Sequence, residues 1–339
     1  MVSNITPTAV GQQNLTGSKE QLFLKMYAGK VLSTFETETK MEGMVDVQTI
    51  SSGKSFTFPV VGRAEAKYHL RGDNMLDPAN GYLNEVEMSE KVIYLDRPLV
   101  SARTTDDWDD LVNHWEAASR LATEQGNALA RKRDQQLLQL LHLASVTDPA
   151  LTNQPSDTDV SQGGTISAAW SFASKAAAQV CIQSMGTAAA RLASRNVPMN
   201  EIYMAMNPVD YYAALTAPDS PFIVYETNKS GPNGNISDGE TAINRVAGFK
   251  IFVSNHMPST AKGEDLGTFN TYGDGAASAD FTDIGALCFH KSCIGSLRRQ
   301  GLTVARQRKE EIIGDLITAY FIEGHGVLRP EAAVTILRA

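Results

Sequence analysis

The sequence predicts an α+β fold in which a long hairpin leads directly into a long helix. Helical and strand patterns occupy separate blocks of the 339 residues, without the regular alternation of strand and helix that builds a parallel sheet. Residues 51–99 have the composition of a hairpin, and residues 106–143 continue as a helical pattern of about 60 Å at a rise of about 1.5 Å per residue. Because two strands alone bury too little apolar area to be stable, we expect a surface outside this chain to cover the hairpin. The chain is therefore interpreted as one unit of a larger assembly.

The chain begins with a polar segment and a helical pattern. Residues 1–18 show no apolar periodicity, which is typical of a mobile arm. Apolar residues between positions 22 and 35 recur at helical spacing, and Gly29 predicts a break or bend in this helix.

The hairpin is predicted from two β-prone runs, Ser55–Val61 and residues 91–99. Between them lies a segment dense in Gly, Asp, Asn and Pro, which is typical of turns. Pro59 and Pro98 cannot donate a ladder hydrogen bond, so both strands should be edges or carry bulges. The result is a two-stranded arm with a polar, irregular tip.

Local signals define the long helix that we expect to begin near Asp106. Thr104 or Thr105 can cap its start, and the aspartates of its first turn favour the positive end of the helix dipole. Gly126 marks either a close packing contact or a bend. The apolar face of this helix begins with three residues that we expect to pack, Trp108, Leu111 and Trp115.

Further elements follow from local patterns. We expect a second helix over roughly residues 167–195, a buried strand over 202–206, a short helix over 208–215 and a strand with a turn at Gly248 over 246–253. The last third is mostly β-prone, at residues 284–290, 302–305, 316–322 and 333–337.

Composition and motifs exclude several classes of protein. A net charge of -8 argues against a chain whose main task is to wrap nucleic acid, and no run of about 18 apolar residues could span a membrane. Residues 52–55 read Ser-Gly-Lys-Ser like the end of a phosphate-binding loop, but Gln48 stands where that motif requires glycine. With no nucleophile, dinucleotide or metal-ligand pattern, we predict no catalytic residues, no cofactor, no metal and no enzyme activity. The three cysteines, which we expect to be reduced and buried, are Cys181, Cys288 and Cys293.

Two groups of basic residues have alternative interpretations. The later group could contact phosphate, but ion pairs within or between subunits fit better because Glu310 and Glu311 follow it directly. Residues 131–133 on the long helix could face a genome or an acidic partner, and we interpret them as a solvated helix face. The later group consists of Arg298, Arg299, Arg306, Arg308 and Lys309.

Two specific motifs lie near the hairpin and near the end of the sequence: residues 50–55 (ISSGKS) with 58–60 (FPV) and 62–63 (GR), and residues 324–333 (GHGVLRPEAA). The first resembles the start of the extended loop, and the second the closing turn, of the major capsid proteins of short-tailed, double-stranded DNA phages of the autographivirus (T-seven) type. Further matches lie at residues 22–25, 90–93, 248–250 and 289–292, so the resemblance covers nearly the whole chain in order.

The resemblance implies the HK97-like major capsid protein fold. The expected parts are an N-terminal arm (residues 1–50), an extended β-hairpin loop (51–100), a peripheral domain with a spine helix and β hinge (101–165 and 300–339), and an axial domain with a mixed sheet (166–299). In such shells the loop lies across the neighbouring subunit. Some members of the fold cross-link through a loop lysine, but we predict no such chemistry for Lys67.

The resemblance also implies a structural function. The chain would form pentamers and hexamers in an icosahedral shell around the phage DNA, through a scaffold-templated procapsid that expands on packaging. Expected partners are other copies of the chain, a scaffolding protein, a portal protein at one vertex, a possible decoration protein and DNA contacted without sequence specificity, but no membrane. The protein would be located in the virion and assembled in the host bacterial cytoplasm. The alternative is an encapsulin-like compartment shell of the same fold.

Candidate functional residues fall into two further groups. The hinge turn comprises Gly324, Gly326, Arg329 and Pro330, where both glycines are either positions of positive φ or simple loop slack. The residues that we expect at inter-subunit contacts are Phe56, Phe58, Arg63, Tyr68, Arg71, Tyr94, Arg97, Arg298, Arg299 and Arg308.

Overall fold

A computed structural model of the chain describes residues 19–61, 66–77, 82, 88–106, 115–147, 164–171, 174–216, 245–258, 281 and 283–338. The chain divides into two compact units, and it passes between them several times. Unit 1 contains the residues up to Glu42, Arg97–Asp134 and Gln300–Glu323. Unit 2 contains Gly43–Asp96, Gln135–Arg299 and the residues from Gly324 onward.

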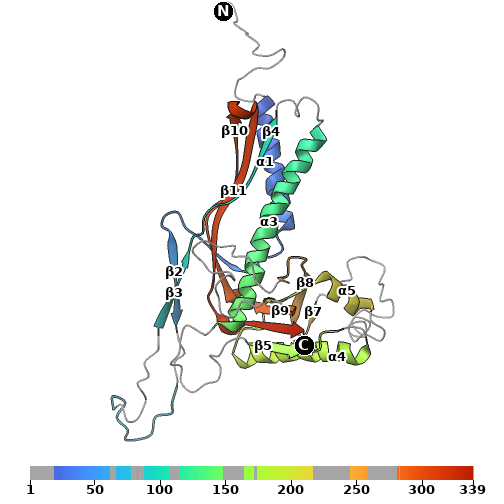
Figure 1. The fold of residues 1–339 in the computed structure, drawn as a ribbon. Helices are drawn as coiled ribbons and strands as arrows, with labels where there is room; N and C mark the ends of the chain where they lie inside the picture. Colours follow the sequence, from blue (N-terminus) through green and yellow to red (C-terminus); the bar gives the residue numbers. More distant parts are fainter. Residues whose placement is uncertain are drawn as a thin grey trace, which may run out of the picture. The chain divides into compact units, whose positions relative to one another are not determined.

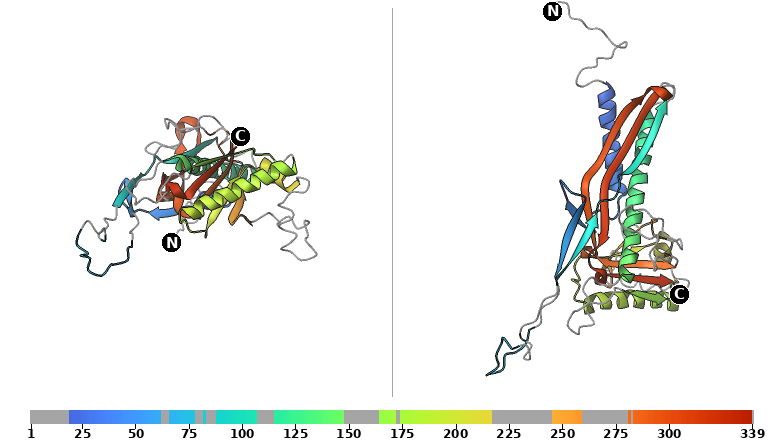
Figure 2. Two further views of the ribbon diagram at one scale, coloured as in Figure 1. Left: turned by 90° about the horizontal axis from the view of Figure 1, so that it is seen from below. Right: turned by 60° about the vertical axis from the view of Figure 1, so that its left-hand side comes forward.

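Unit 1 packs two helices on one face of a sheet. Its helices are α1 (Lys19–Glu38) and the first part of α3 (Trp115–Val146). Its strands are β4 (Leu99–Asp106) and most of β10 (Ile294–Lys309) and β11 (Gly314–Val327), with the short turn η3 (Glu310–Ile312) between the last two. These strands stand in the order β10-β11-β4, and β4 pairs antiparallel with β11 so that Leu99 lies opposite Phe321. In the right-hand view of Figure 2, α1 and α3 lie behind these strands.

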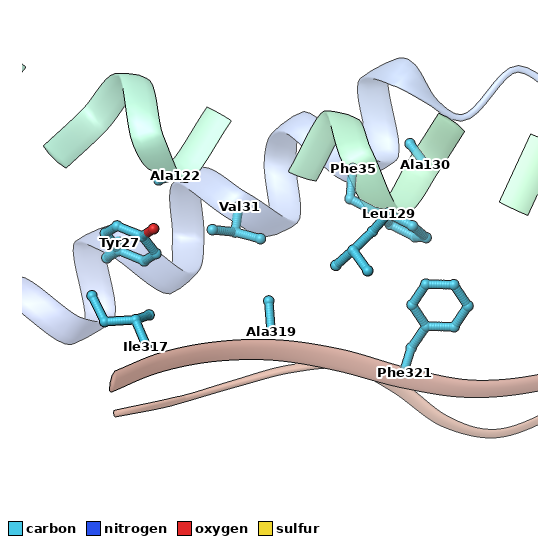
Figure 3. Packing of buried hydrophobic residues seen from close by; sticks show 9 residues of the cluster. All are labelled: Tyr27, Val31, Phe35, Ala122, Leu129, Ala130, Ile317, Ala319 and Phe321. Carbon is cyan, nitrogen blue, oxygen red and sulfur yellow. The ribbon is translucent and has the colours of Figure 1, made fainter. Parts of the chain in front are cut away.

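The core of unit 1 forms where the apolar stripe of α1 meets α3 and β11. The α1 stripe, Tyr27, Val31 and Phe35, recurs every four residues and so lies on one helix face. Phe35 packs against Phe321 with ring centroids 5.4 Å apart, and the Tyr27 hydroxyl donates to Gln125 Oε1 over 2.8 Å. Figure 3 shows the cluster, which is completed by Ala122, Leu129, Ala130, Ile317 and Ala319.

Glycine sets the distance between the two helices. A Cβ atom at Gly126 would lie 2.8 Å from the carbonyl oxygen of Val31, so Gly126 makes the close packing contact that was one of its two interpretations. The break predicted at Gly29 is wrong, because α1 runs without interruption from Lys19 to Glu38.

Unit 2 is built on a six-stranded mixed sheet. Its order is β5 (Thr165–Ala168), β12 (Ala333–Arg338), β9 (Ile284–His290), β6 (Ile202–Met206), β8 (Phe249–Val253) and β7 (Arg245–Val246). All seven residues of β9 are buried, which explains its continuous apolar sequence. The turn predicted at Gly248 is present between β7 and β8, and Ala247 and Gly248 both have positive φ there.

Helices and short turns complete unit 2. Helix α4 (Lys175–Ser194) packs along β5 and β12 and is capped by Ser174, whose side chain accepts a hydrogen bond from the Ala177 N–H (Figure 1). Helix α5 (Pro208–Thr216) follows β6. The turns η2 (Lys291–Cys293) and η4 (Pro330–Ala332) precede β10 and β12. The three cysteines are buried and free, as expected.

The predicted hairpin is present as a separate two-stranded sheet. Strand β2 (Ser55–Val61) pairs antiparallel with β3 (Met88–Tyr94), and Pro59 stands opposite Glu90. The short strand β1 (Asp46–Thr49) precedes the hairpin and pairs in parallel with the start of β10.

Several predicted boundaries are wrong. Thr104, Thr105 and Asp106 pair with β11 as the end of β4, so neither threonine caps the long helix. The second strand of the hairpin ends at Tyr94 rather than at residue 99, and the region predicted to start the second helix contains strand β5. In the part of the chain that the structure describes, no helix combines the length and apolarity needed to cross a membrane.

The contact at Gly126 predicts opposite effects for two glycine substitutions. Gly29→Ala adds a Cβ where nothing lies within 4 Å, so helix propensity alone should raise the free energy of unfolding by up to about 1 kcal/mol. Gly126→Ala gains the same propensity but must displace the α1 backbone, and overpacking of about 1–3 kcal/mol should make it destabilising. Urea denaturation of dispersed subunits measures both changes, and an equal gain for the two variants would contradict the contact.

Candidate inter-subunit surface

The β2–β3 hairpin exposes apolar side chains on a sheet that has no third strand among the described residues. Phe56 is 37% exposed, Tyr94 48% and Met88 74%. Phe58 is buried and contacts Phe56 edge to face, with centroids 4.9 Å apart. This amount of exposed apolar surface on an unsupported hairpin is characteristic of an interaction site.

The described tip of the hairpin, residues 66–77 with Tyr82, adds further apolar surface. Tyr68 is 98% exposed, Leu70 66% and Leu76 74%. The tip is therefore less polar at its surface than its turn-rich sequence indicated. Arg71, a predicted contact residue, is also exposed here.

Backbone hydrogen bonds hold the base of the hairpin to β10 and to itself. The Ile50 N–H donates to the Arg298 carbonyl over 3.0 Å, and the Leu95 N–H donates to the Lys54 carbonyl over 2.8 Å. Arg299 Nη1 donates to the Gly53 carbonyl over 3.1 Å. The two arginines predicted to act between subunits therefore also fix the start of the hairpin within the chain.

Two glycines of β11 allow the end of β3 to cross it closely. A Cβ at Gly324 would lie 2.0 Å from the carbonyl oxygen of Tyr94, and one at Gly326 would lie 2.8 Å from Cγ1 of Ile93. Both glycines lie within β11 and neither has a positive φ, so their interpretation as positions of positive φ is wrong. Their role is close backbone approach, which no side chain permits.

The turn after β11 is fixed by hydrogen bonds to η2. The N–H groups of Leu328 and Arg329 both donate to the Cys293 carbonyl, over 2.9 and 3.2 Å. Arg329 also pairs with Glu331, at 2.8 Å between Nε and Oε1. In the same region the pKa of His290 is lowered, mainly by burial and also by the nearby Arg329 charge.

The basic residues make their ion pairs within the chain. Arg306 donates to Asp315, at 2.9 Å from its Nε, and Arg308 lies 4.0 Å from the same carboxylate. The expectation of ion pairs is thus confirmed for Arg306 and Arg308, whose partner is Asp315 and not the adjacent Glu310 or Glu311.

The interpretation of residues 131–133 as a solvated helix face is wrong for Arg133. Its side chain is fully buried, donates from Nε to Glu323 over 2.7 Å and also pairs with Glu42. Next to it, Asp134 accepts from the Lys40 N–H over 2.9 Å, so both residues tie α3 to the segment after α1. The spacing of Leu129, Arg133 and Leu137 every four residues was a signal that placed this arginine on the buried face.

The face of the unit 1 sheet that points away from α1 and α3 has no charged side chain over its middle. Side chains on this face alternate along the strands with core residues such as Ile317 and Ala319. Val100 is 52% exposed and Ala102 is also exposed. A solvated sheet face normally carries polar and charged residues, so this face is a second candidate contact surface. It comprises Val100, Ala102, Thr104, Thr303, Ala305, Leu316, Thr318 and Tyr320.

Arg63, Trp108 and Leu111 lie outside the described residues, and of Trp115 only the backbone, in α3, is described. Arg97 is exposed after β3, and Pro330 is buried as the first residue of η4. Among the described residues, no group of three or more His, Cys, Asp or Glu side chains could hold a metal ion.

The buried position of Arg133 predicts a large loss of stability on its removal. Arg133→Met leaves Glu323 buried without its partner, which should cost about 3–5 kcal/mol. Arg131→Met, on the exposed side of the same turn, should change stability by less than about 0.5 kcal/mol. Urea denaturation of dispersed subunits distinguishes the two, and equal midpoints would rule out the buried pair.

The crossing at Gly324 predicts that alanine cannot replace it. Gly324→Ala must push the end of β3 away, and we expect a loss of about 3 kcal/mol, at the upper end of overpacking costs. The matched control is Gly301→Ala in β10, where a Cβ would have nothing within 4 Å. Thermal unfolding of the two variants provides the test, and a wild-type melting temperature for Gly324→Ala would refute the close crossing.

Comparison with known proteins identifies relatives along almost the whole chain. Residues 57–337 match the family described as Gp10A-like major capsid protein. The chain is 27% identical to the major capsid protein of Escherichia phage T7 over 336 residues, which covers 95% of this chain and 93% of that protein. It is also 27% identical to the major capsid protein of Enterobacteria phage T3, covering 97% and 95% of the two chains.

Solved structures agree with these relatives. The capsid of cyanophage P-SCSP1u is similar with a TM-score of 0.70 and 30% identity over 99% of both chains. The mature capsid of bacteriophage PhiM1 has a TM-score of 0.68 at 16% identity, covering 88% of this chain and 86% of that one. The expected HK97-like fold is thereby confirmed.

Proposed function

This chain belongs to the Gp10A-like major capsid protein family, and on that premise we propose how its copies build a shell. As a major capsid protein it is a structural component of the virion, and shells of this kind are assembled from many copies. We propose that the copies form pentamers and hexamers of an icosahedral shell around the phage double-stranded DNA. A scaffolding protein templates a rounded precursor, which expands when DNA is packaged.

The exposed β2–β3 hairpin, which the described part of its own chain does not cover, supports this proposal most strongly. Phe56, Tyr94 and Met88 are exposed on a sheet of two strands, and such a sheet needs further contacts to be stable. A neighbouring copy supplies them when the hairpin lies across it. The uncharged face of the unit 1 sheet, which includes Val100 and Tyr320, is a described surface whose chemistry matches an apolar hairpin.

The contacts expected from the sequence keep their role in this proposal. Tyr68 and Arg71 at the tip, and Arg97 after β3, are exposed and available to a neighbour. Each contact is weak, and the closed shell gains its stability because every subunit makes many contacts at once. We assign residues 1–50 to an arm, 51–100 to the extended loop, 101–165 with 300–339 to the peripheral domain and 166–299 to the axial domain.

The remaining partners follow from the same role. A portal protein occupies one vertex, a decoration protein can bind the outer surface, and assembly takes place in the host cytoplasm. With a net charge of -8, the chain contacts DNA weakly and without sequence readout. We propose that it has no catalytic activity. A compartment that encloses protein cargo is the less supported alternative, because the curated relatives named above are phage capsid proteins.

Co-expression with the scaffolding protein of the same phage tests the proposal directly. We expect negative-stain microscopy to show uniform hollow shells, because the scaffold fixes the curvature that the weak subunit contacts leave open. The control is the same chain without residues 66–77, most of the described hairpin tip, which should fold but give no shells. A stable, monodisperse monomer in both cultures would contradict the proposed function.

A further inference from the structure

Hydrogen bonds in the tip of the hairpin converge on Tyr82. Its hydroxyl oxygen accepts from the Leu70 N–H over 3.0 Å. The same hydroxyl lies 2.9 Å from Oδ2 of Asp73 and 3.3 Å from the Tyr68 carbonyl, so its single proton goes to the shorter, charge-assisted bond with the carboxylate. The ring also lies against His69, with centroids 5.6 Å apart.

Local turns make the rest of the tip compact. The Asp73 N–H donates to the Leu70 carbonyl over 3.1 Å, across a turn in which Gly72 has a φ of +99°. The Leu76 N–H donates to the Asn74 side chain over 3.0 Å, and the Asp77 N–H to the Asn74 carbonyl over 3.2 Å. Residues 68–77 therefore form an ordered turn tied to Tyr82 across the loop.

This ordered backbone displays apolar side chains to solvent. Tyr68 is 98% exposed, Leu70 66%, Met75 55% and Leu76 74%. The charged residues of the same segment, Lys67, Arg71, Asp73 and Asp77, sum to zero. A pre-formed apolar group avoids the cost of ordering a loop on binding, which is how interface anchors gain affinity.

We propose that Tyr82 is a positioning residue that pre-folds the hairpin tip for docking on a second copy of this chain. The inference rests on the proposed function and names the group that prepares its contact surface. A balanced charge gives the tip no preference for DNA or for a strongly charged protein. The uncharged sheet face of unit 1, which includes Val100 and Tyr320, offers a second copy a surface of matching chemistry.

Tyr82→Phe tests the role of the hydroxyl, because it keeps the ring against His69 and removes the three oxygen contacts. In dispersed subunits we expect the Leu70 amide to exchange its hydrogen about fivefold faster, as for the loss of one net hydrogen bond. The melting temperature should not change, since the tip lies outside both cores. The concentration needed for shell assembly with scaffold should rise at least about fivefold, because the tip must then be ordered on docking.

Tyr68→Ser is the matched control, because Tyr82 meets the backbone carbonyl of Tyr68 while the Tyr68 side chain is almost completely exposed. This variant should raise the assembly concentration without changing exchange at Leu70. The proposal is overturned if Tyr82→Phe leaves Leu70 exchange unchanged, or if exchange accelerates and assembly does not respond. Weaker binding of the scaffolding protein to dispersed Tyr82→Phe subunits would assign the tip to the scaffolding protein and also overturn the proposal. Failure of the wild-type chain to form any shell would instead refute the proposed function, while the exchange result would still decide whether Tyr82 orders the tip.

Discussion

The close crossing of β11 by the end of β3 is the constraint on which the hairpin depends. At Gly324 the two backbones approach so closely that a single added methyl group would overlap the Tyr94 carbonyl. Gly326 also lies close to the side chain of Ile93, which is 1% exposed, and Gly295 to the side chains of Leu328 and Ile93. The base of the hairpin is thereby buried and closely packed. Beyond the base, no third strand among the described residues pairs with β2 or β3. A firm base and an uncovered arm together make the hairpin suited to reach another subunit.

In unit 1, buried polar side chains fix the position of α1 on α3. Helix α3 buries an unusual number of polar side chains, including Gln125, Arg133 and Asp134, and each of these meets a partner from α1 or from the segment that follows it. Such pairs add little net stability compared with apolar packing, but they penalise any displaced arrangement, since displacement leaves a buried charge unpaired. The close contact at Gly126 also penalises a shift of α1 along α3. The N-terminal helix is therefore held in one register on α3 by geometry and charge as well as by apolar area.

The sequence predicted those elements whose signals are local. Strands β6 and β9 and helix α5 lie where their composition and turn residues placed them, and the motifs at residues 50–63 and 324–333 identified the shell fold. Strand β4 was missed because it has few apolar residues and is stabilised by pairing with β11, more than 200 positions away in the chain. Thr104 and Thr105 resemble helix caps, and only that pairing shows that they continue a strand. The glycines of the hinge were recognised, but their close approach to β3 and the hydrogen bonds of Tyr82 depend on distant or irregular contacts that no periodicity reveals.

A near-atomic cryo-electron microscopy structure of the assembled shell would show whether other copies of the chain cover the hairpin. We expect the exposed side chains of β2, β3 and the tip, among them Phe56 and Leu76, to lie against the sheet of a neighbouring subunit. A shell in which this hairpin folds back onto its own chain, or projects into solvent without a neighbour, would contradict this expectation.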